Sequence, residues 1–102
     1  MKHVMVRYKV KPDRSEENEA LVRAVYEELR HTRPAGLQYA TYVMEDGVSF
    51  VHIASVDTED GSSPLPKVQA FKEFTAGVEE RCDEAPVVSE LREIGSFNLH
   101  DK

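Results

Sequence analysis

The chain has 102 residues and a formal net charge of −6 at pH 7. Its length predicts one domain, residues 1–102, and its acidic balance argues against a nucleic-acid partner or an anionic membrane surface. No stretch approaches the ~20 apolar residues of a membrane span. The single cysteine, Cys82, excludes an intramolecular disulfide and predicts a location in the reducing cytoplasm.

The first third of the chain predicts a strand followed by a helix. Residues 3–10, HVMVRYKV, alternate between two faces, as strands do. Pro12 ends this alternation, and Asp13 with Glu16 resembles a capping box that opens a helix. An apolar stripe at a spacing of three to four residues follows, and a proline and a glycine at 34–36 end the helix. The stripe consists of Leu21, Val22, Val25 and Leu29.

The middle of the chain predicts a β-hairpin. Residues 37–44 (LQYATYVM) and 48–56 (VSFVHIASV) flank Asp46 and Gly47, and Asp-Gly between two such runs indicates a type I′ turn with positive φ at both residues. The resulting register consists of six pairs: Tyr39 with Ala54, Ala40 with Ile53, Thr41 with His52, Tyr42 with Val51, Val43 with Phe50 and Glu45 with Val48.

The last part predicts a loop, a second helix and a final strand. The acidic segment 57–64 is not a calcium loop, because the twelfth residue from its start is not Glu. Ser63 and Pro64 predict the start of the helix, and residues 86–99 predict the strand, with Gly95 as a bulge. The expected buried stripe of the helix is Val68, Phe71, Phe74, Thr75, Val78 and Cys82.

The order βαββαβ predicts an α+β, ferredoxin-like fold with a four-stranded antiparallel sheet and both helices on one face. We expect the most apolar set to face the helices: Val4, Val6, Val10, Ala40, Val51 and Ile53. The open face would then carry a mixed set: Met5, Arg7, Lys9, Tyr39, Thr41, Val43, Phe50 and His52. Such a mixture predicts a second sheet packed about 10 Å away, with a pocket retained between the sheets.

Three segments carry a family resemblance: HVMVRYKVKPDRSEENEALVRAVYEEL, YVMEDGVSFVHIASV and SPLPKVQAFKEFTAGVEERC. They resemble small dimeric α/β-barrel proteins of the antibiotic-biosynthesis-monooxygenase-like branch. The resemblance implies a homodimer, formed through the open sheet face, whose two sheets close into a barrel. The superfamily includes cofactor-free oxygenases, haem-degrading enzymes and stress-responsive proteins.

The chain departs from the haem-binding members of that superfamily. The haem-degrading pattern uses an Asn, a Trp and a His on the second helix, whereas this chain has no Trp and its predicted second helix has no His. His3 does fall where stress-responsive members carry a first-strand His. We therefore expect neither a cofactor nor a metal.

Two residues are candidates for catalysis. His52 on a pocket wall would be a general base, because the imidazole pKa of ~6.5 is easily tuned; its alternative is a structural histidine bonded to Thr41. Arg7 would stabilise negative charge near His52; its alternative is an ion pair with Glu90 or Glu93. Tyr39, Thr41, Phe50 and Met5 would contact the substrate or pack in the dimer. Cys82, among acidic residues, is not expected to be a nucleophile.

The leading hypothesis is a cytoplasmic homodimer that binds a small, partly apolar molecule. If it is an enzyme, we expect a cofactor-independent monooxygenase-like activity on an activated aromatic or enolisable compound. The alternative is a non-catalytic ligand-binding or dimerisation module, because a fold alone does not determine function.

Overall fold

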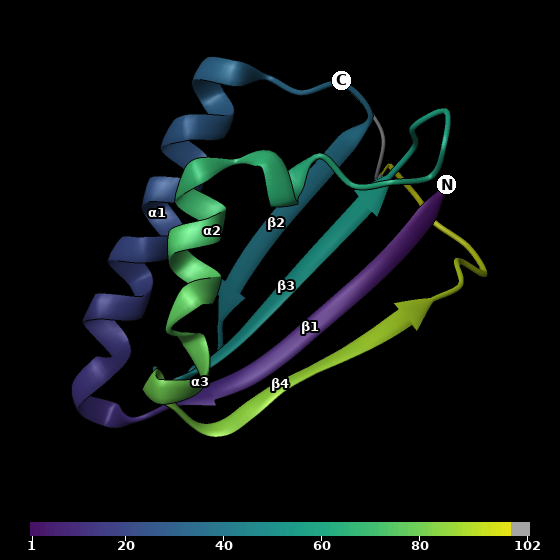
Figure 1. The fold of residues 1–102 in the computed structure, drawn as a ribbon. Coiled ribbons are helices and arrows are strands. Elements are labelled where there is room, and N and C mark those ends of the chain that lie inside the picture. The colour runs from purple at the N-terminus through teal and green to yellow at the C-terminus, as the bar shows by residue number, and fades with distance from the viewer. Residues whose placement is uncertain (99–102) are drawn as a thin grey trace.

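A computed structural model of the chain describes residues 1–98. Four strands form one sheet, and the helices lie on one side of it (Figure 1). The elements in chain order are β1 (Lys2–Val10), the 3₁₀ turn η1 (Pro12–Arg14), α1 (Ser15–Thr32), β2 (Leu37–Val43), β3 (Ser49–Val56), the 3₁₀ turn η2 (Leu65–Lys67), α2 (Gln69–Ala76), α3 (Val78–Arg81) and β4 (Cys82–Leu91).

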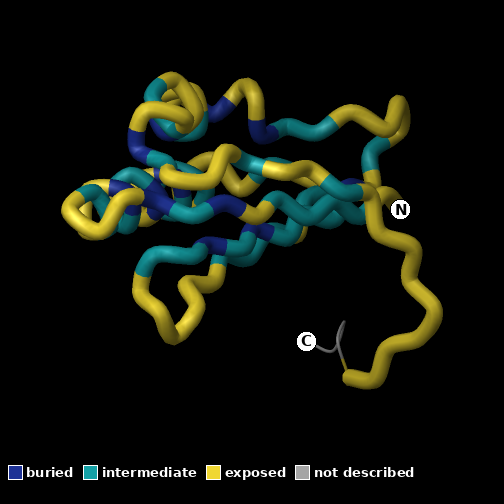
Figure 2. The backbone as a smooth tube through the Cα atoms, turned by 90° about the horizontal axis from the view of Figure 1, so that it is seen from below, coloured by how far each residue is buried: buried dark blue, intermediate teal, exposed yellow. Residues whose placement is uncertain are grey.

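The sheet has the order β2-β3-β1-β4, and each strand pairs antiparallel with its neighbours. This confirms the predicted ferredoxin-like fold. The core lies between the helices and the sheet, while the segment after β4 runs exposed away from the sheet (Figure 2). Among the helices of residues 1–98, none has the length and apolar character needed to cross a membrane.

The beginnings of both helices differ from the prediction. The capping box at Asp13 is wrong: α1 begins at Ser15, and its N-cap residue, Arg14, makes no side-chain capping bond. Ser63 accepts a bond from the Leu65 N–H at 3.1 Å just before the 3₁₀ turn η2, whose N-cap residue is Pro64, and α2 begins only at Gln69.

Helix α2 is capped from α1. The two carboxylate oxygens of Glu28 accept bonds from the backbone N–H groups of Gln69 and Ala70, at 3.1 and 2.9 Å. A carboxylate at this position satisfies unpaired N–H groups and complements the positive end of the helix dipole. This contact, across 41 residues of sequence, fixes one end of α2 over the sheet.

The last strand is shifted toward the N-terminus relative to the prediction. β4 runs over Cys82–Leu91, so Cys82 begins the strand and does not end the helix. Gly95 lies beyond the strand; the irregularity in pairing falls between Arg7 and Val10 of β1, opposite β4. The predicted final strand residue Leu99, and His100, lie outside the described residues.

The hairpin has the predicted register but a different turn. Five of the six predicted pairs are present between β2 and β3, whereas Glu45 and Val48 lie in the turn and do not pair. However, the Gly47 N–H bonds to the Met44 carbonyl, which makes Glu45 and Asp46 the central residues of the turn. Gly47 has a φ of +77°, but Asp46 is not among the residues of positive φ, so the type I′ prediction is wrong. The Asp46 carboxylate instead accepts the Val48 and Ser49 N–H groups.

The face assignment of the hairpin is also wrong, although that of β1 is right. Val6 lies opposite His52, and His52 lies opposite Thr41, so these three side chains share one face. Val10, with no exposed surface, and Phe50, 1% exposed, are buried in the core. The helix side is therefore formed by Val4, Val6, Tyr8, Val10, Tyr39, Thr41, Phe50, His52, Ala54 and Val56. The open face carries Met5, Arg7, Lys9, Ala40, Tyr42, Val51 and Ile53.

We predict that Gly36→Ala destabilises the fold by more than ~2 kcal/mol, because a Cβ at this residue of φ +78° would lie 2.5 Å from the Asp57 carbonyl. That carbonyl cannot retreat easily, since the Asp57 N–H bonds to Gly36 at the end of the hairpin. Gly47→Ala is the matched control: its φ is +77° with no atom within 4 Å, so it should cost only ~1 kcal/mol. Urea unfolding measures both, and equal losses would contradict this account.

Candidate functional site

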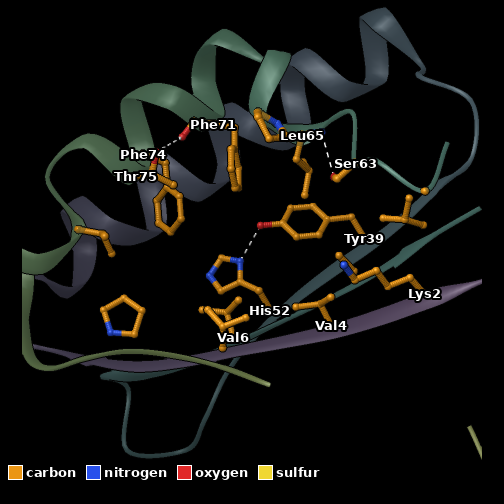
Figure 3. Close-up of a pocket in the computed structure, with 17 residues that line it drawn as sticks. Lys2, Val4, Val6, Tyr39, His52, Ser63, Leu65, Phe71, Phe74 and Thr75 are labelled. Carbon is orange, nitrogen blue, oxygen red and sulfur yellow. Dashed lines mark hydrogen bonds between the residues drawn. The ribbon is translucent and has the colours of Figure 1, made fainter. Parts of the chain in front are cut away.

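A cavity of about 410 Å³ lies between α2 and the helix side of the sheet (Figure 3). Its walls are mainly apolar: Val4, Val6, Ala54, Val56, Leu65, Pro66, Phe71, Phe74, Val78, Pro86 and Val88. Polar side chains on the walls are Lys2, Tyr39, His52, Ser63 and Thr75. Val88 is 66% exposed, so the cavity reaches solvent along β4. This cavity lies on the helix side of one chain and differs from the predicted pocket between two sheets, which stays a prediction.

His52 forms the centre of a buried polar cluster on the cavity wall. The residue is 4% exposed, because β3 places it under α2, beside Phe74. Its Nε2 lies 2.8 Å from the Tyr8 hydroxyl, and its Nδ1 lies 2.7 Å from the Tyr39 hydroxyl and 3.0 Å from Thr41 Oγ1. Both ring nitrogens therefore have hydrogen-bond partners. Figure 3 shows the Tyr39 hydroxyl directed toward His52 beneath Phe71.

The cluster continues away from the cavity to Asn18 on α1 and Arg81 at the end of α3. Asn18 Nδ2 donates to the Tyr8 hydroxyl at 2.9 Å, and Arg81 Nε donates to Asn18 Oδ1 at 3.1 Å. Arg81 also donates to the Phe74 carbonyl at 2.8 Å. Asn18 has no exposed surface and Arg81 is 2% exposed. A chain of hydrogen bonds thus joins a buried guanidinium to the cavity wall.

Burial keeps three side chains of this cluster, His52, Tyr8 and Tyr39, neutral. Desolvation lowers the pKa of His52 to about 4, so the imidazole is uncharged at pH 7. Desolvation also raises the pKa of Tyr8 and of Tyr39 well above the ordinary value, which keeps both phenols protonated. At neutral pH the three side chains therefore act as uncharged donors and acceptors.

The structure brings together only part of the predicted site. Tyr39 and His52 line the cavity, and Thr41 bonds to His52. Phe50 is a core residue stacked on Tyr8, with ring centroids 5.6 Å apart. Whether these residues act on a substrate stays a prediction.

Arg7 and Met5 lie on the opposite face from His52, since Tyr8, between Arg7 and Lys9 in β1, points toward the helices. The predicted placement of Arg7 beside His52 is therefore wrong. The arginine of the His52 cluster is Arg81, which is 63 residues away from Asn18 in sequence.

Sequence reasoning missed Asn18, Arg81 and the polar role of Tyr8. One signal was available for Asn18: it precedes Val22 and Val25 at helical spacing, on the stripe that faces the core. A polar residue at such a position requires a buried partner. Nothing in the sequence indicated that this partner was Arg81.

No group of three or more His, Cys, Asp or Glu residues within residues 1–98 is arranged to hold a metal ion. His3, on the open face, bonds to Ser55 across the strands at 2.7 Å.

We predict that His52 makes stability depend on pH between about 6.5 and about 4. An unfolded histidine titrates near ~6.5, whereas folding lowers the pKa of His52 to about 4. As the pH falls through this window, the unfolded chain takes up a proton that the folded chain does not, so the free energy of unfolding decreases. Between pH 7 and pH 5 we expect the His52 contribution to fall by about 2 kcal/mol.

Urea unfolding at the two pH values tests this. His52→Gln should remove the pH-dependent part, whatever its own stability, while His31→Gln, at an exposed residue, should retain the fall. An equal pH dependence in the natural chain and in His52→Gln would contradict the prediction.

Searches against protein-family models and against curated proteins found no match. Solved structures do match. An antibiotic biosynthesis monooxygenase superposes with a TM-score of 0.76 at 18% identity, over 93% of this chain and 100% of that chain. Rv0793 from Mycobacterium tuberculosis gives 0.73 at 21% identity, over 93% and 96%.

SnoaB, a cofactor-independent oxygenase from Streptomyces nogalater, gives a TM-score of 0.69 at 13% identity, over 94% of this chain and 95% of that chain. Identities this low establish the fold and leave the activity open. The chain has the ferredoxin-like fold of the antibiotic-biosynthesis-monooxygenase-like proteins, as its sequence resemblance predicted.

Proposed function

We propose that this protein binds a small, largely apolar molecule in the cavity beneath α2 and acts on it as a cofactor-independent monooxygenase. One observation carries the proposal: an apolar cavity of about 410 Å³ whose wall includes the His52 cluster. Ligand pockets of about 300–1,000 Å³ commonly combine apolar walls with a few polar groups. The similarity in fold to a cofactor-independent oxygenase favours this chemistry. A cytoplasmic location is part of the proposal.

Binding is tested by narrowing the cavity. Ala54 lines it, whereas Ala24 lies on the exposed side of α1. We expect the uncharged fluorophore N-phenyl-1-naphthylamine to bind the natural chain and Ala24→Leu alike. Ala54→Leu should weaken binding at least tenfold, because its added carbons occupy the space of the ligand. Equal binding by the two variants would place the ligand elsewhere.

The chemistry is tested with anthrone, an enolisable aromatic ketone. Loss of a methylene proton gives an enolate, which adds dioxygen to form a hydroperoxide. The hydroperoxide loses water to leave anthraquinone, so one oxygen atom stays in the product and the other leaves as water. We expect faster oxygen consumption and anthraquinone formation with the natural chain than with Ala54→Leu. Equal rates would reject catalysis in this cavity.

The second candidate is a ligand-binding protein without turnover. The state of His52 favours it: both ring nitrogens are hydrogen-bonded, and burial lowers the pKa to about 4, which makes the imidazole a weak base. Probe binding without accelerated anthrone oxidation would support this candidate.

We also propose that the open sheet face forms a homodimer in which two sheets pack together. Half-buried Met5, Val51 and Ile53 lie there beside Tyr42, 58% exposed, and Val87, 55% exposed. An apolar surface of this kind is typical of a protein interface.

Sedimentation velocity at micromolar concentrations tests the dimer. We expect the natural chain to sediment as a dimer and Ile53→Glu as a monomer, because a carboxylate cannot be buried there without a partner. Ala24→Glu, on the exposed side of α1, should remain dimeric. A monomeric natural chain would refute the interface.

A further inference from the structure

The hydrogen-bond chain behind the cavity has a defined direction, which starts at Arg81. A guanidinium only donates, so the Asn18 atom that faces Arg81 Nε must be its oxygen, Oδ1. The Asn18 nitrogen then faces Tyr8 and donates to the Tyr8 hydroxyl oxygen. Asn18 is completely buried, so exchange of its oxygen and nitrogen would leave two donors facing each other.

The direction passes through Tyr8 to His52. The two partners that residues 1–98 offer the Tyr8 hydroxyl are Asn18 and His52 Nε2. Because Asn18 donates to Tyr8, the hydroxyl hydrogen of Tyr8 has its acceptor at Nε2 of His52. The opposite arrangement, with a proton on Nε2, would leave that buried hydroxyl hydrogen without an acceptor, which costs about 1–3 kcal/mol. This cost favours the neutral tautomer of His52 that carries its proton on Nδ1.

The Nδ1 proton determines what the cavity offers a ligand. It points at two oxygens: the Tyr39 hydroxyl oxygen, 2.7 Å from Nδ1, and Thr41 Oγ1, 3.0 Å from Nδ1. The Tyr39 oxygen therefore accepts from His52, and the hydrogen of Tyr39 is directed elsewhere: to Thr41, with which it also interacts, or to an atom in the cavity. Thr41 has a second partner in the Tyr26 hydroxyl at 2.8 Å, so it does not depend on Tyr39.

We propose that the Tyr39 hydroxyl is the hydrogen-bond donor that recognises a carbonyl oxygen of the ligand, and that Asn18 and Arg81 are positioning residues that hold it in this role through Tyr8 and His52. The proposal rests on the proposed function of the cavity and narrows its ligand to an apolar ring system with a ketone or quinone oxygen. His52 and Thr41, which bond to each other beside Tyr39, are uncharged, so this end suits a neutral oxygen better than a carboxylate.

This arrangement changes the chemistry expected of His52. With Nδ1 protonated and Nε2 bonded to Tyr8, the imidazole cannot accept a proton from the cavity. Its contribution is indirect: it donates to Tyr39 and so strengthens the donor that Tyr39 offers. If the ligand forms an enolate, the same hydrogen bond stabilises the negative oxygen, as preorganised donors do in oxyanion holes.

The direction of the chain can be reversed by one isosteric change. In Asn18→Asp the carboxylate still accepts from Arg81, but it cannot donate to Tyr8. The Tyr8 hydroxyl then donates to the carboxylate, His52 donates from Nε2 to Tyr8, and Tyr39 donates to the unprotonated Nδ1. The Tyr39 hydrogen is thereby withdrawn from the cavity, without loss of volume or of the Arg81 contact.

The experiment uses 1-tetralone and tetralin, which share a bicyclic skeleton and differ in the ketone oxygen. Calorimetric titration measures both affinities, and ¹⁵N NMR of the imidazole reports which nitrogen of His52 is protonated. For the natural chain we expect the Nδ1-protonated tautomer and roughly three- to tenfold tighter binding of 1-tetralone than of tetralin. Asn18→Asp should show the Nε2-protonated tautomer and no preference, with tetralin affinity retained.

Two further variants complete the test. Tyr39→Phe should abolish the preference for 1-tetralone, whereas Tyr42→Phe, which removes an exposed hydroxyl on the opposite face of the sheet, should preserve it. A natural chain that binds both probes equally, or that is protonated on Nε2, overturns this inference and leaves the proposed cavity function intact. A natural chain that binds neither probe overturns the proposed function and this inference together.

Discussion

The hydrogen bond between Tyr8 and His52 joins the two halves of the molecule. It lies between β1 and β3, and it links the helices to the cavity. Asn18, itself held by Arg81, bonds to the Tyr8 hydroxyl. Tyr39 and Thr41 bond to the other ring nitrogen of His52. A buried polar cluster is tolerated only when its members satisfy one another. Within residues 1–98 no buried side-chain nitrogen or oxygen lacks a partner.

This need for buried partners explains why the prediction from apolar character assigned the hairpin side chains to the wrong faces of the sheet. Val51 and Ile53 are more apolar than Thr41 and His52, so a ranking by polarity directs Val51 and Ile53 to the core. The structure buries the polar set, because Tyr8, Asn18 and Tyr26 supply its hydrogen bonds from other elements. The register of the strands was predicted correctly from their alternation and from the position of the turn, although the turn type was wrong. The side that faces the helices was not, because it depends on partners distant in sequence.

Two residues of the site were predictable from the sequence, and Arg81 was not. His52 and Tyr39 stood out as polar or aromatic residues at paired positions, and both line the cavity. Arg81 did not stand out, because a basic residue near a helix end is ordinary and its burial depends on Phe74 and Asn18. The family resemblance predicted the fold, and the fold places no particular side chain in the cavity.

Helix α2 forms one wall of the cavity and the sheet forms the opposite wall. Two contacts hold α2 in place, and neither involves the sheet. Glu28 holds its N-terminal end, and Arg81 bonds to the Phe74 carbonyl near its C-terminal end. The opposite wall consists of strands, and their side chains Tyr8, His52 and Tyr39 form most of the polar cluster. Substitutions at Phe71 or Thr75 of α2 can therefore change the shape of the cavity without disturbing the hydrogen bonds of the polar cluster on the sheet. Such a division lets the shape of the cavity change while the polar cluster on its wall is retained.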